Sequence, residues 1–552
     1  MKKKLKSALA LLLSLLCLLP MLSLAGFAAN PTYDVDYPVV YIAGKFTTIY
    51  DKDLTSYDNK EEVDAHQLYP LKTPLADKIK DQKVINEIVL AYNISNLTGN
   101  WKYFADKAYS IIEPMYRDLV LDGNGNITNG SHIKPVPKPV ARLGGFGLST
   151  YMFTYDSRLD PYENAEKLKD YINEVLRITG KTKVNLIGRC LGTTLVSTYL
   201  TEYGCSKVET AIFYASAFNG VQMMDDFFTG NIEFNAKQIQ YYLDYGKITS
   251  SESYAIINNA WNIFNALGFT GSGVNTANKV WKKTAPYLHA RLVRAIFGTW
   301  PGHWAMISAN SYEAAKKAVF GDCMDQYAGL IKKLDRYQKN VMSVWPQTLK
   351  NMVEKEGLRI AIFSKYNTPL TPLSPEDSQQ ADGTVELETM SLGAKSAPIG
   401  ETYSAEEIRE LKNRGRGRYL SPDNRVDATD CMFPDYTWFI RDVAHDAYPK
   451  TINRLFMDIF HSKTQVTVWN NTRGIPQFVA FNKNDGLIYR ILGPNSLQAI
   501  PDNEDDLEET LPPDPVYWHE TEKVHKNVFN YVADWIVDFV TKIMNLFGMN
   551  RK

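Results

Sequence analysis

Predominantly apolar stretches alternate with one clear amphipathic segment along the first half of this chain. Residues 39–44, 151–155, 184–187 and 208–214 are short stretches rich in β-branched and aromatic residues, which predict strands. Between the second and third of these, residues 163–179 repeat apolar positions with the period of a helix. Strands and helices that alternate at this spacing predict a mostly parallel, doubly wound α/β sheet.

The strand pattern resumes after residue 355. Residues 358–364 and 436–444 predict two more core strands, the second of them as the last strand of the main sheet, and residues 451–460 predict a helix. The charged, glycine-interrupted residues 395–430 are expected to form an exposed loop. Three later stretches predict short antiparallel strands of a small appendage: 464–469, 476–481 and 486–492.

The residues between the two sheet-forming parts are mostly helical in pattern and rich in methionine and aromatic residues, which predicts a cap or lid. A polar insertion is expected at residues 47–140. In chain order we expect a signal peptide at 1–28, the first part of the core at 29–215, the cap at 216–355, the second part of the core at 356–463, a β appendage with an acidic linker at 464–515, and an amphipathic helix at 516–552.

The first 28 residues carry four lysines, a long apolar run and then small residues up to Ala28, which is the pattern of a cleaved signal peptide. An uncleaved membrane anchor is the alternative. We therefore expect a secreted protein. Its formal net charge of -1 argues against a nucleic-acid partner. The final helix, 516–552, either packs against the body or lies at a membrane surface, and the sequence leaves the oligomeric state open.

The candidate chemistry is concentrated in the pentapeptide GRCLG at residues 188–192. A G-x-nucleophile-x-G motif between a strand and a helix is a nucleophile elbow, here with Cys190 in the place of the usual serine. The flanking Gly188 and Gly192 are expected because the sharp turn brings strand and helix close together. The helix N-terminus favours a thiolate there and can stabilise an oxyanion. The alternative is a small, buried, purely structural cysteine.

A longer segment around this motif resembles a known family. Residues 153–192, FTYDSRLDPYENAEKLKDYINEVLRITGKTKVNLIGRCLG, are similar to the lecithin:cholesterol acyltransferase and phospholipid:diacylglycerol acyltransferase family, which has a Y-D-W-R-L-like stretch, a helix and then the elbow. The run PVVYIAGKF resembles that family's first strand and oxyanion loop. The chain departs from the family pattern at four positions: Ala43 for Pro, Ser157 for Trp, Arg189 for His and Cys190 for Ser.

The resemblance extends to a second motif, ADGTVEL at residues 381–387, which is similar to the family's D-G-D-G-T-V-P segment. It implies that Asp382 is the triad carboxylate, although an ordinary Asp-Gly turn is the alternative. His445 follows the strand expected at 436–444 and precedes a helix, where this fold carries its general base; His461 is the runner-up. The order Cys190, Asp382, His445 is the nucleophile, acid, base order of α/β-hydrolases.

The remaining histidines and cysteines are expected to have structural roles. His289 and His303 lie in the cap with no acidic partner at ligand spacing. Processing would leave four cysteines, too few for a disulfide scaffold, with Cys323 and Cys431 as the favoured pair for any bridge. No cluster has metal-ligand spacing, so neither a metal nor another cofactor is expected.

These features together predict an α/β-hydrolase fold and a secreted, lipase-like or esterase-like enzyme. Cys190, Asp382 and His445 would hydrolyse an ester, most simply a lipid ester, or transfer its acyl group to an alcohol. The backbone amides of Phe46 and Leu191 would form the oxyanion hole. Contact with a lipid surface is left open. The alternative is an inactive secreted protein of the same fold that binds lipid or a surface polymer.

Overall fold

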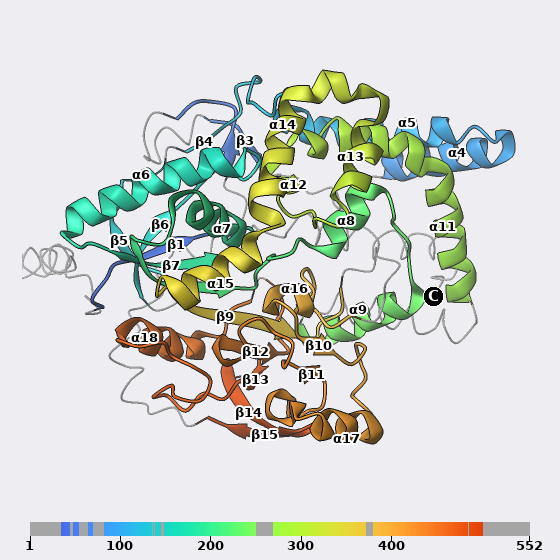
Figure 1. The fold of residues 1–552 in the computed structure, drawn as a ribbon. Coiled ribbons are helices and arrows are strands. Elements are labelled where there is room, and N and C mark those ends of the chain that lie inside the picture. The colour runs from blue at the N-terminus through green and yellow to red at the C-terminus, as the bar shows by residue number, and fades with distance from the viewer. Residues whose placement is uncertain are drawn as a thin grey trace, which may run out of the picture.

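The structure is a computed structural model of the chain. It describes residues 35–44, 48–54, 65–69, 82–134, 136, 138–144, 148–249, 269–370, 379–445, 447–483 and 485–500. The predicted signal peptide (1–28), the amide of Phe46, the acidic linker from residue 501 and the final helix (516–552) lie outside these residues. Within the described part, a large mixed sheet runs through the molecule with helices around it, which confirms the predicted α/β class (Figure 1).

The main sheet has ten strands in the described part, in the order β15-β14-β13-β12-β9-β8-β7-β1-β6-β5. The strands are β1 (Val39–Ile42), β5 (Ala141–Leu143), β6 (Ser149–Phe153), β7 (Val184–Arg189), β8 (Val208–Tyr214), β9 (Arg359–Tyr366), β12 (Thr437–Arg441), β13 (Phe478–Asn482), β14 (Leu487–Gly493) and β15 (Ser496–Ala499). All pairs from β6 to β13 are parallel, and the outer pairs at both edges are antiparallel.

The central strands are buried on both faces, which is why they read as continuous apolar stretches. In β8, Ala211 and Phe213 join one core, while Ile212 and Tyr214 join the other. The first core packs the sheet against α6 (Pro161–Thr179), α7 (Leu191–Tyr203) and α15 (Trp345–Lys355). The second packs it against α18 (Asn453–His461) and the cap. The sheet is therefore covered by helices on both sides, as the sequence predicted.

The inserted cap is helical, as predicted. Its elements are α8 (Gln222–Thr229), α9 (Ala236–Thr249), α11 (Phe269–Leu288), the π-helical η2 (His289–Arg294), η3 (Phe297–Thr299), α12 (Pro301–Trp304), α13 (Tyr312–Phe320), η4 (Gly321–Tyr327), α14 (Ala328–Tyr337) and η5 (Gln338–Met342). Trp300, Trp304 and Phe228 are buried in the same core as the sheet. The aromatic residues of the cap therefore fix it to the body.

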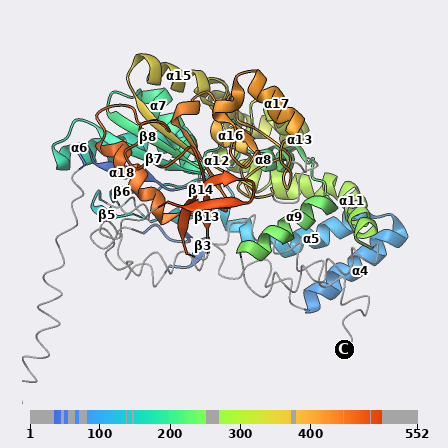
Figure 2. The ribbon, with the colours of Figure 1, turned by 90° about the horizontal axis from the view of Figure 1, so that it is seen from below.

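The N-terminal insertion contributes to the same helical layer. It contains α4 (Gln82–Thr98), α5 (Trp101–Tyr116), η1 (Arg117–Leu119) and a small sheet of β2 (Ile49–Tyr50), β3 (Gln67–Tyr69) and β4 (His132–Ile133). Arg291 of the cap pairs with Asp106 of α5 at 2.7 Å, and Lys283 lies over the Trp101 ring. Helices α4, α5, α9 and α11 form one group beside the sheet (Figure 2). Two insertions far apart in sequence thus support one another.

The sheet continues beyond the strand that the sequence predicted as its last. Strand β13 pairs in parallel with β12, with Phe478 opposite Phe439, and β14 and β15 extend the sheet in antiparallel fashion. Residues 464–469 form no strand. Because β12 is buried along its whole length, its second edge needs a hydrogen-bonding partner, and β13 supplies it. Two of the three predicted appendage strands are therefore part of the main sheet, as β13 and β14.

The segment 395–430 is more ordered than the exposed loop predicted from its charges. It contains β10 (Lys395–Ser396), α17 (Ala405–Asn413), η6 (Arg416–Tyr419) and β11 (Val426–Asp427), and α16 (Leu387–Ser391) precedes it. Helix α17 is exposed, but Asp423 is fully buried. Its carboxylate accepts hydrogen bonds from Arg441 at 3.0 Å and from the Tyr366 hydroxyl at 2.9 Å. This buried pairing attaches the segment to the ends of β9 and β12.

Candidate active site

Four adjacent parallel strands each lead directly into a residue with positive φ. Cys190 follows β7, Ala215 follows β8, Asn367 follows β9 and Asp442 follows β12, with φ of 51°, 52°, 68° and 66°. Positive φ is uncommon outside glycine, so this row of turns is strained backbone. It lies at the carboxyl ends of the strands, where open α/β sheets bind their ligands. This edge of the sheet is therefore the candidate location of a functional site.

The elbow turn around Cys190 is sharp and tightly packed. Cys190 has φ 51° and ψ -126° and immediately precedes α7. A Cβ atom added to Gly44 would lie 2.2 Å from the Arg189 carbonyl oxygen and 2.4 Å from the Cys190 Cβ atom. One added to Gly192 would lie 2.4 Å from the Ile42 carbonyl oxygen. The elbow therefore packs directly on the end of β1, and side chains at Gly44 and Gly192 would force the two apart.

The other elbow residues have distinct surroundings. Gly188 is less tightly enclosed, since its added Cβ atom would come no closer than 3.0 Å to Val196 Cγ2. Leu191 is the first residue of α7, where backbone N–H groups have no acceptor within the helix. Burial raises the pKa of the Tyr41 hydroxyl, and the charge and hydrogen bond of Arg189 oppose that rise. Arg189 thus places a cation beside the Tyr41 hydroxyl.

Asp382 is fully buried in a turn that follows β9. Its Oδ1 atom accepts hydrogen bonds from the Thr384 amide at 3.0 Å and from the Val385 amide at 2.8 Å. These bonds make the segment an Asp-Gly turn and at the same time fix the carboxylate, which leaves the Oδ2 atom to face His445. Asp382 can therefore form an Asp-Gly turn and pair with a histidine at the same time, because Oδ1 accepts the bonds of the turn while Oδ2 faces His445.

His445 and Asp382 are brought together although 63 residues separate them in sequence. The distance from His445 Nδ1 to Asp382 Oδ2 is 2.7 Å, and both side chains are buried. Burial would lower the pKa of His445, but the charge of Asp382, the proximity of Cys190 and the hydrogen bond to Asp382 raise it to about 10. Burial would likewise raise the pKa of Asp382, but the charge and hydrogen bond of His445 and the charge of Lys365 hold it below its usual value.

Cys190 reaches the other side of this imidazole. The His445 Nε2 atom is buried and makes no close hydrogen bond to a described residue, so its interaction with the thiol is looser than the bond to Asp382. Cys190 itself is only partly buried. Catalytic hydrogen bonds are often long before a substrate binds. The structure thus brings all three predicted triad residues close together, with Cys190 partly exposed and Asp382 fully buried.

Sequence reasoning missed two buried titratable side chains beside this site. Lys365 on β9 is fully buried and bonds to the backbone around His445, at a distance of 2.7 Å from its carbonyl oxygen. Glu386 accepts a hydrogen bond from the amide of Gln222, the first residue of α8, at 3.0 Å. Burial and the nearby charges of Asp225 and Asp382 raise the pKa of Glu386 to about 8. A lysine inside an otherwise apolar strand was the available signal for the first.

The other candidate residues lie elsewhere. His461 ends α18, and its Nδ1 atom bonds to the Met457 carbonyl oxygen. In the cap, His289 bonds to the Phe228 carbonyl oxygen, and burial lowers the pKa of His303 to about 3.

All four cysteines of the described part are free. The bridge between Cys323 and Cys431 that the sequence favoured is therefore absent, and Cys431 is buried while Cys323 is partly exposed.

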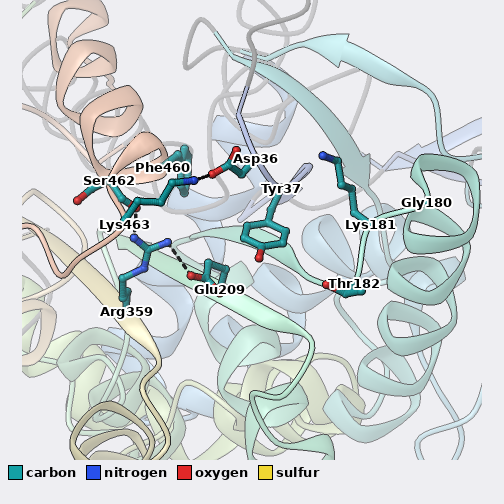
Figure 3. A pocket seen from close by; sticks show the side chains of 10 residues that line it. All are labelled: Asp36, Tyr37, Gly180, Lys181, Thr182, Glu209, Arg359, Phe460, Ser462 and Lys463. Atoms are coloured by element: carbon teal, nitrogen blue, oxygen red, sulfur yellow. Dashed lines mark hydrogen bonds and ion pairs between the residues drawn. The ribbon is translucent and has the colours of Figure 1, made fainter.

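A polar pocket of about 380 Å³ lies at the opposite, amino-terminal end of the strands (Figure 3). Arg359 at the start of β9 pairs there with Glu209 at 3.0 Å, and Lys463 pairs with Asp36. The side chains of Lys463 and Asp36 are 77% and 52% exposed. The charged side chains of Lys463 and Asp36 are therefore exposed to solvent, whereas those of His445 and Asp382 are buried.

Comparisons with known proteins give no relative for this chain: no protein-family model matches it, and no curated protein matches it. Among the residues described, no group of three or more His, Cys, Asp or Glu side chains is placed to hold a metal ion. No helix in the same residues is long and apolar enough to cross a membrane. Function must therefore be inferred from the geometry of the site.

Proposed function

We propose that this protein is an acyl hydrolase or acyltransferase that uses Cys190 as nucleophile, His445 as base and Asp382 as the residue that orients the base. The observation that supports this best is the 2.7 Å bond between His445 and Asp382, formed beside a cysteine on a strained strand-to-helix turn. The three residues follow their strands in the chain order of α/β-hydrolases. The resemblance to the lecithin:cholesterol acyltransferase family favours a lipid ester as substrate.

The first half of the reaction acylates Cys190. His445 Nε2 holds the thiol proton, and the thiolate attacks the ester carbonyl carbon to form a C–S bond. The negative charge on the carbonyl oxygen is stabilised by the Leu191 amide and, by position, that of Phe46. When the C–O bond breaks, the alcohol leaves with the proton from His445. An acyl thioester on Cys190 remains.

The second half releases the acyl group. Water, or an acceptor alcohol, gives a proton to His445 Nε2 and attacks the thioester carbon. The thiolate leaves and recovers the proton, so the enzyme returns to its starting state with a free acid or a new ester as product. Asp382 stays ionised throughout, which matches its lowered pKa and its enclosed position.

The cap supports a site that closes over an apolar substrate. Helix α8 is bonded through Gln222 to Glu386, four residues after the catalytic acid. Tyr245 of α9 lies near Thr368, two residues after β9; burial raises the pKa of the Tyr245 hydroxyl, and Thr368 opposes that rise. Two cap helices thus contact the loop that carries Asp382. Their movement would open the site or exclude water from it.

The test is site-resolved alkylation by iodoacetamide together with hydrolysis of p-nitrophenyl esters of increasing acyl length. We expect Cys190 to react faster than the other cysteines and Cys190→Ala to abolish ester turnover. Burial raises the pKa of Cys205 to about 11 and that of Cys431 to about 12, so both should react slowly.

Cys323 provides the matched control because it is also partly exposed. Cys323→Ala should leave ester turnover unchanged. If Cys190 reacts no faster than Cys323 and no ester is hydrolysed, the proposal fails and the binding protein of the same fold is the better interpretation.

A further inference from the structure

Lys365 occupies a position that is unusual for a lysine. It lies near the carboxyl end of the central strand β9 and is fully buried. Residues alternate along the strand, so Lys365 shares a face with Ala361 and Phe363, which belong to the core beneath α18. Burying an ammonium group costs several kcal/mol unless its hydrogen bonds are replaced. The groups that hydrogen-bond to the buried ammonium therefore indicate what Lys365 does in the fold.

The Lys365 ammonium donates hydrogen bonds to the backbone around His445. The Nζ atom donates to the carbonyl oxygens of Ala444 at 3.0 Å, His445 at 2.7 Å and Ala447 at 3.0 Å. Three carbonyl acceptors require three N–H donors, and only the protonated amine has three. The side chain is thus a cation that holds three carbonyls of one turn.

Two further groups interact with this cation. Its Nζ atom lies 4.6 Å from the centre of the Tyr214 ring, a cation–π contact, and the Tyr214 hydroxyl donates to the same Ala447 carbonyl at 3.3 Å. The charge of Lys365 also contributes to the lowered pKa of Asp382. Lys365 therefore acts on both the turn that carries the base and the carboxylate that orients it.

We propose that Lys365 is a positioning residue that holds the His445 turn so that the imidazole lies between Asp382 and Cys190. The inference rests on the proposed function, because it assigns a role within the same triad. Lys365 does not touch the reacting atoms. It acts through the backbone of His445, whose side chain has no other anchor in the described part than Asp382 and the thiol.

The experiment compares Lys365→Met, which removes charge and hydrogen bonds, with Lys365→Gln, which keeps N–H donors but not the charge. The structural readout is the low-field proton NMR signal of the His445 Nδ1–H that bonds to Asp382. The kinetic readout is kcat and KM for a p-nitrophenyl ester. Lys365→Met should broaden or abolish the NMR signal and lower kcat by up to about 100-fold with KM little changed. Lys365→Gln should lie between Lys365→Met and the wild type.

Lys316→Met is the matched control, since Lys316 of the cap also bonds through its ammonium, to Glu313 at 2.8 Å and Asp335 at 2.9 Å. It should leave the NMR signal and kcat unchanged. A folded Lys365→Met protein with the wild-type signal and kcat within about twofold of wild type would overturn the proposal. If Lys365→Met does not fold, Lys365→Gln is judged by the same two readouts.

Failure of the proposed function can be told apart from failure of this inference. A wild-type protein without ester turnover and without a reactive Cys190 refutes the enzyme. The NMR signal then still decides whether Lys365 positions His445: loss of the signal in Lys365→Met supports the positioning role, and an unchanged signal overturns it.

Discussion

The two ends of the same parallel strands carry charges in opposite ways. At the amino ends, Glu209 lies between Lys183 at 2.8 Å and Arg359 at 3.0 Å, and its side chain is 22% exposed. At the carboxyl ends, Asp382 and Lys365 are fully buried and His445 nearly so. The amino-end pairs share their charges with water, which screens them. The groups at the carboxyl ends are removed from water, so the free energy of each buried charge depends on where its partner groups lie.

The difference indicates which end of the sheet carries chemistry. A pocket is visible at the amino ends, yet its ionic groups are arranged as surface ion pairs (Figure 3). At the carboxyl ends, groups that are costly to bury are held by strained turns and backbone hydrogen bonds. Functional sites are where such costs are expected to be retained. Matched substitutions at the two ends should therefore differ in their effects on stability and turnover.

The largest difference is expected between Asp382→Asn and Glu209→Gln. Asp382→Asn removes one partner of a buried pair and should lower the free energy of unfolding by about 3 to 5 kcal/mol. It should also lower ester turnover by about 100-fold or more, because His445 loses the group that orients it. Glu209→Gln should cost about 1 kcal/mol or less and leave turnover unchanged. Urea unfolding and steady-state kinetics measure both, and equal losses at the two ends would contradict the comparison.

The next largest difference concerns backbone packing, in Gly44→Ala and Gly180→Ala. The added methyl group at Gly44 meets backbone and Cys190 within 2.4 Å, so we expect a loss of about 3 kcal/mol. Gly180 has open space around it but a φ of 65°, which costs an alanine about 1 kcal/mol. Thermal unfolding monitored by circular dichroism gives both values. A Gly44→Ala protein as stable as Gly180→Ala would show that the elbow is not tightly packed.

The smallest effect is a pH dependence that only the carboxyl end should show. The pKa of Glu386 is raised from 4.5 to about 8, so the folded state keeps the proton that the unfolded state releases. Stability from Glu386 is therefore complete below pH 4.5 and is lost as the pH rises through about 8. Glu386→Gln should remove this loss and be more stable than wild type at pH 9, by on the order of 2 kcal/mol.

Unfolding in urea at pH 5, 7 and 9 tests this dependence. Glu209→Gln serves again as the amino-end control and should follow the wild-type profile across this range. If Glu386→Gln and the wild type lose stability in parallel as the pH rises, the carboxyl group of Glu386 is not the cause.

The sequence predicts the core strands and the elbow because both are local. Buried strands require continuous apolar residues, and the sharp turn after β7 requires glycine at position 192, where a Cβ atom would meet the end of β1. That Asp382 and His445 should meet follows from topology, since β9 and β12 are neighbours and their carboxyl ends lie at one edge. These predictions need no knowledge of side-chain contacts.

Other features depend on contacts that no local pattern encodes. Lys365 bonds to carbonyl groups about 80 residues further along the chain, and Glu386 bonds to a cap helix 164 residues before it. The buried Asp423 looks like one more charge in a charged segment until Arg441 and Tyr366 are seen beside it. The partner of β12 could likewise be identified only from the three-dimensional pairing.

The row of positive-φ turns also determines how the site responds to thermal fluctuation. The Cys190 amide donates to the Tyr214 carbonyl oxygen of β8 at 3.0 Å, and the Ala215 amide donates to Phe363 of β9 at 3.0 Å. These two turns are thus closed by the neighbouring strand rather than by their own loops. These amides should exchange with deuterated solvent only when central strands separate, in the slowest class of the protein. Movement of the cap would therefore leave the backbone beneath it assembled.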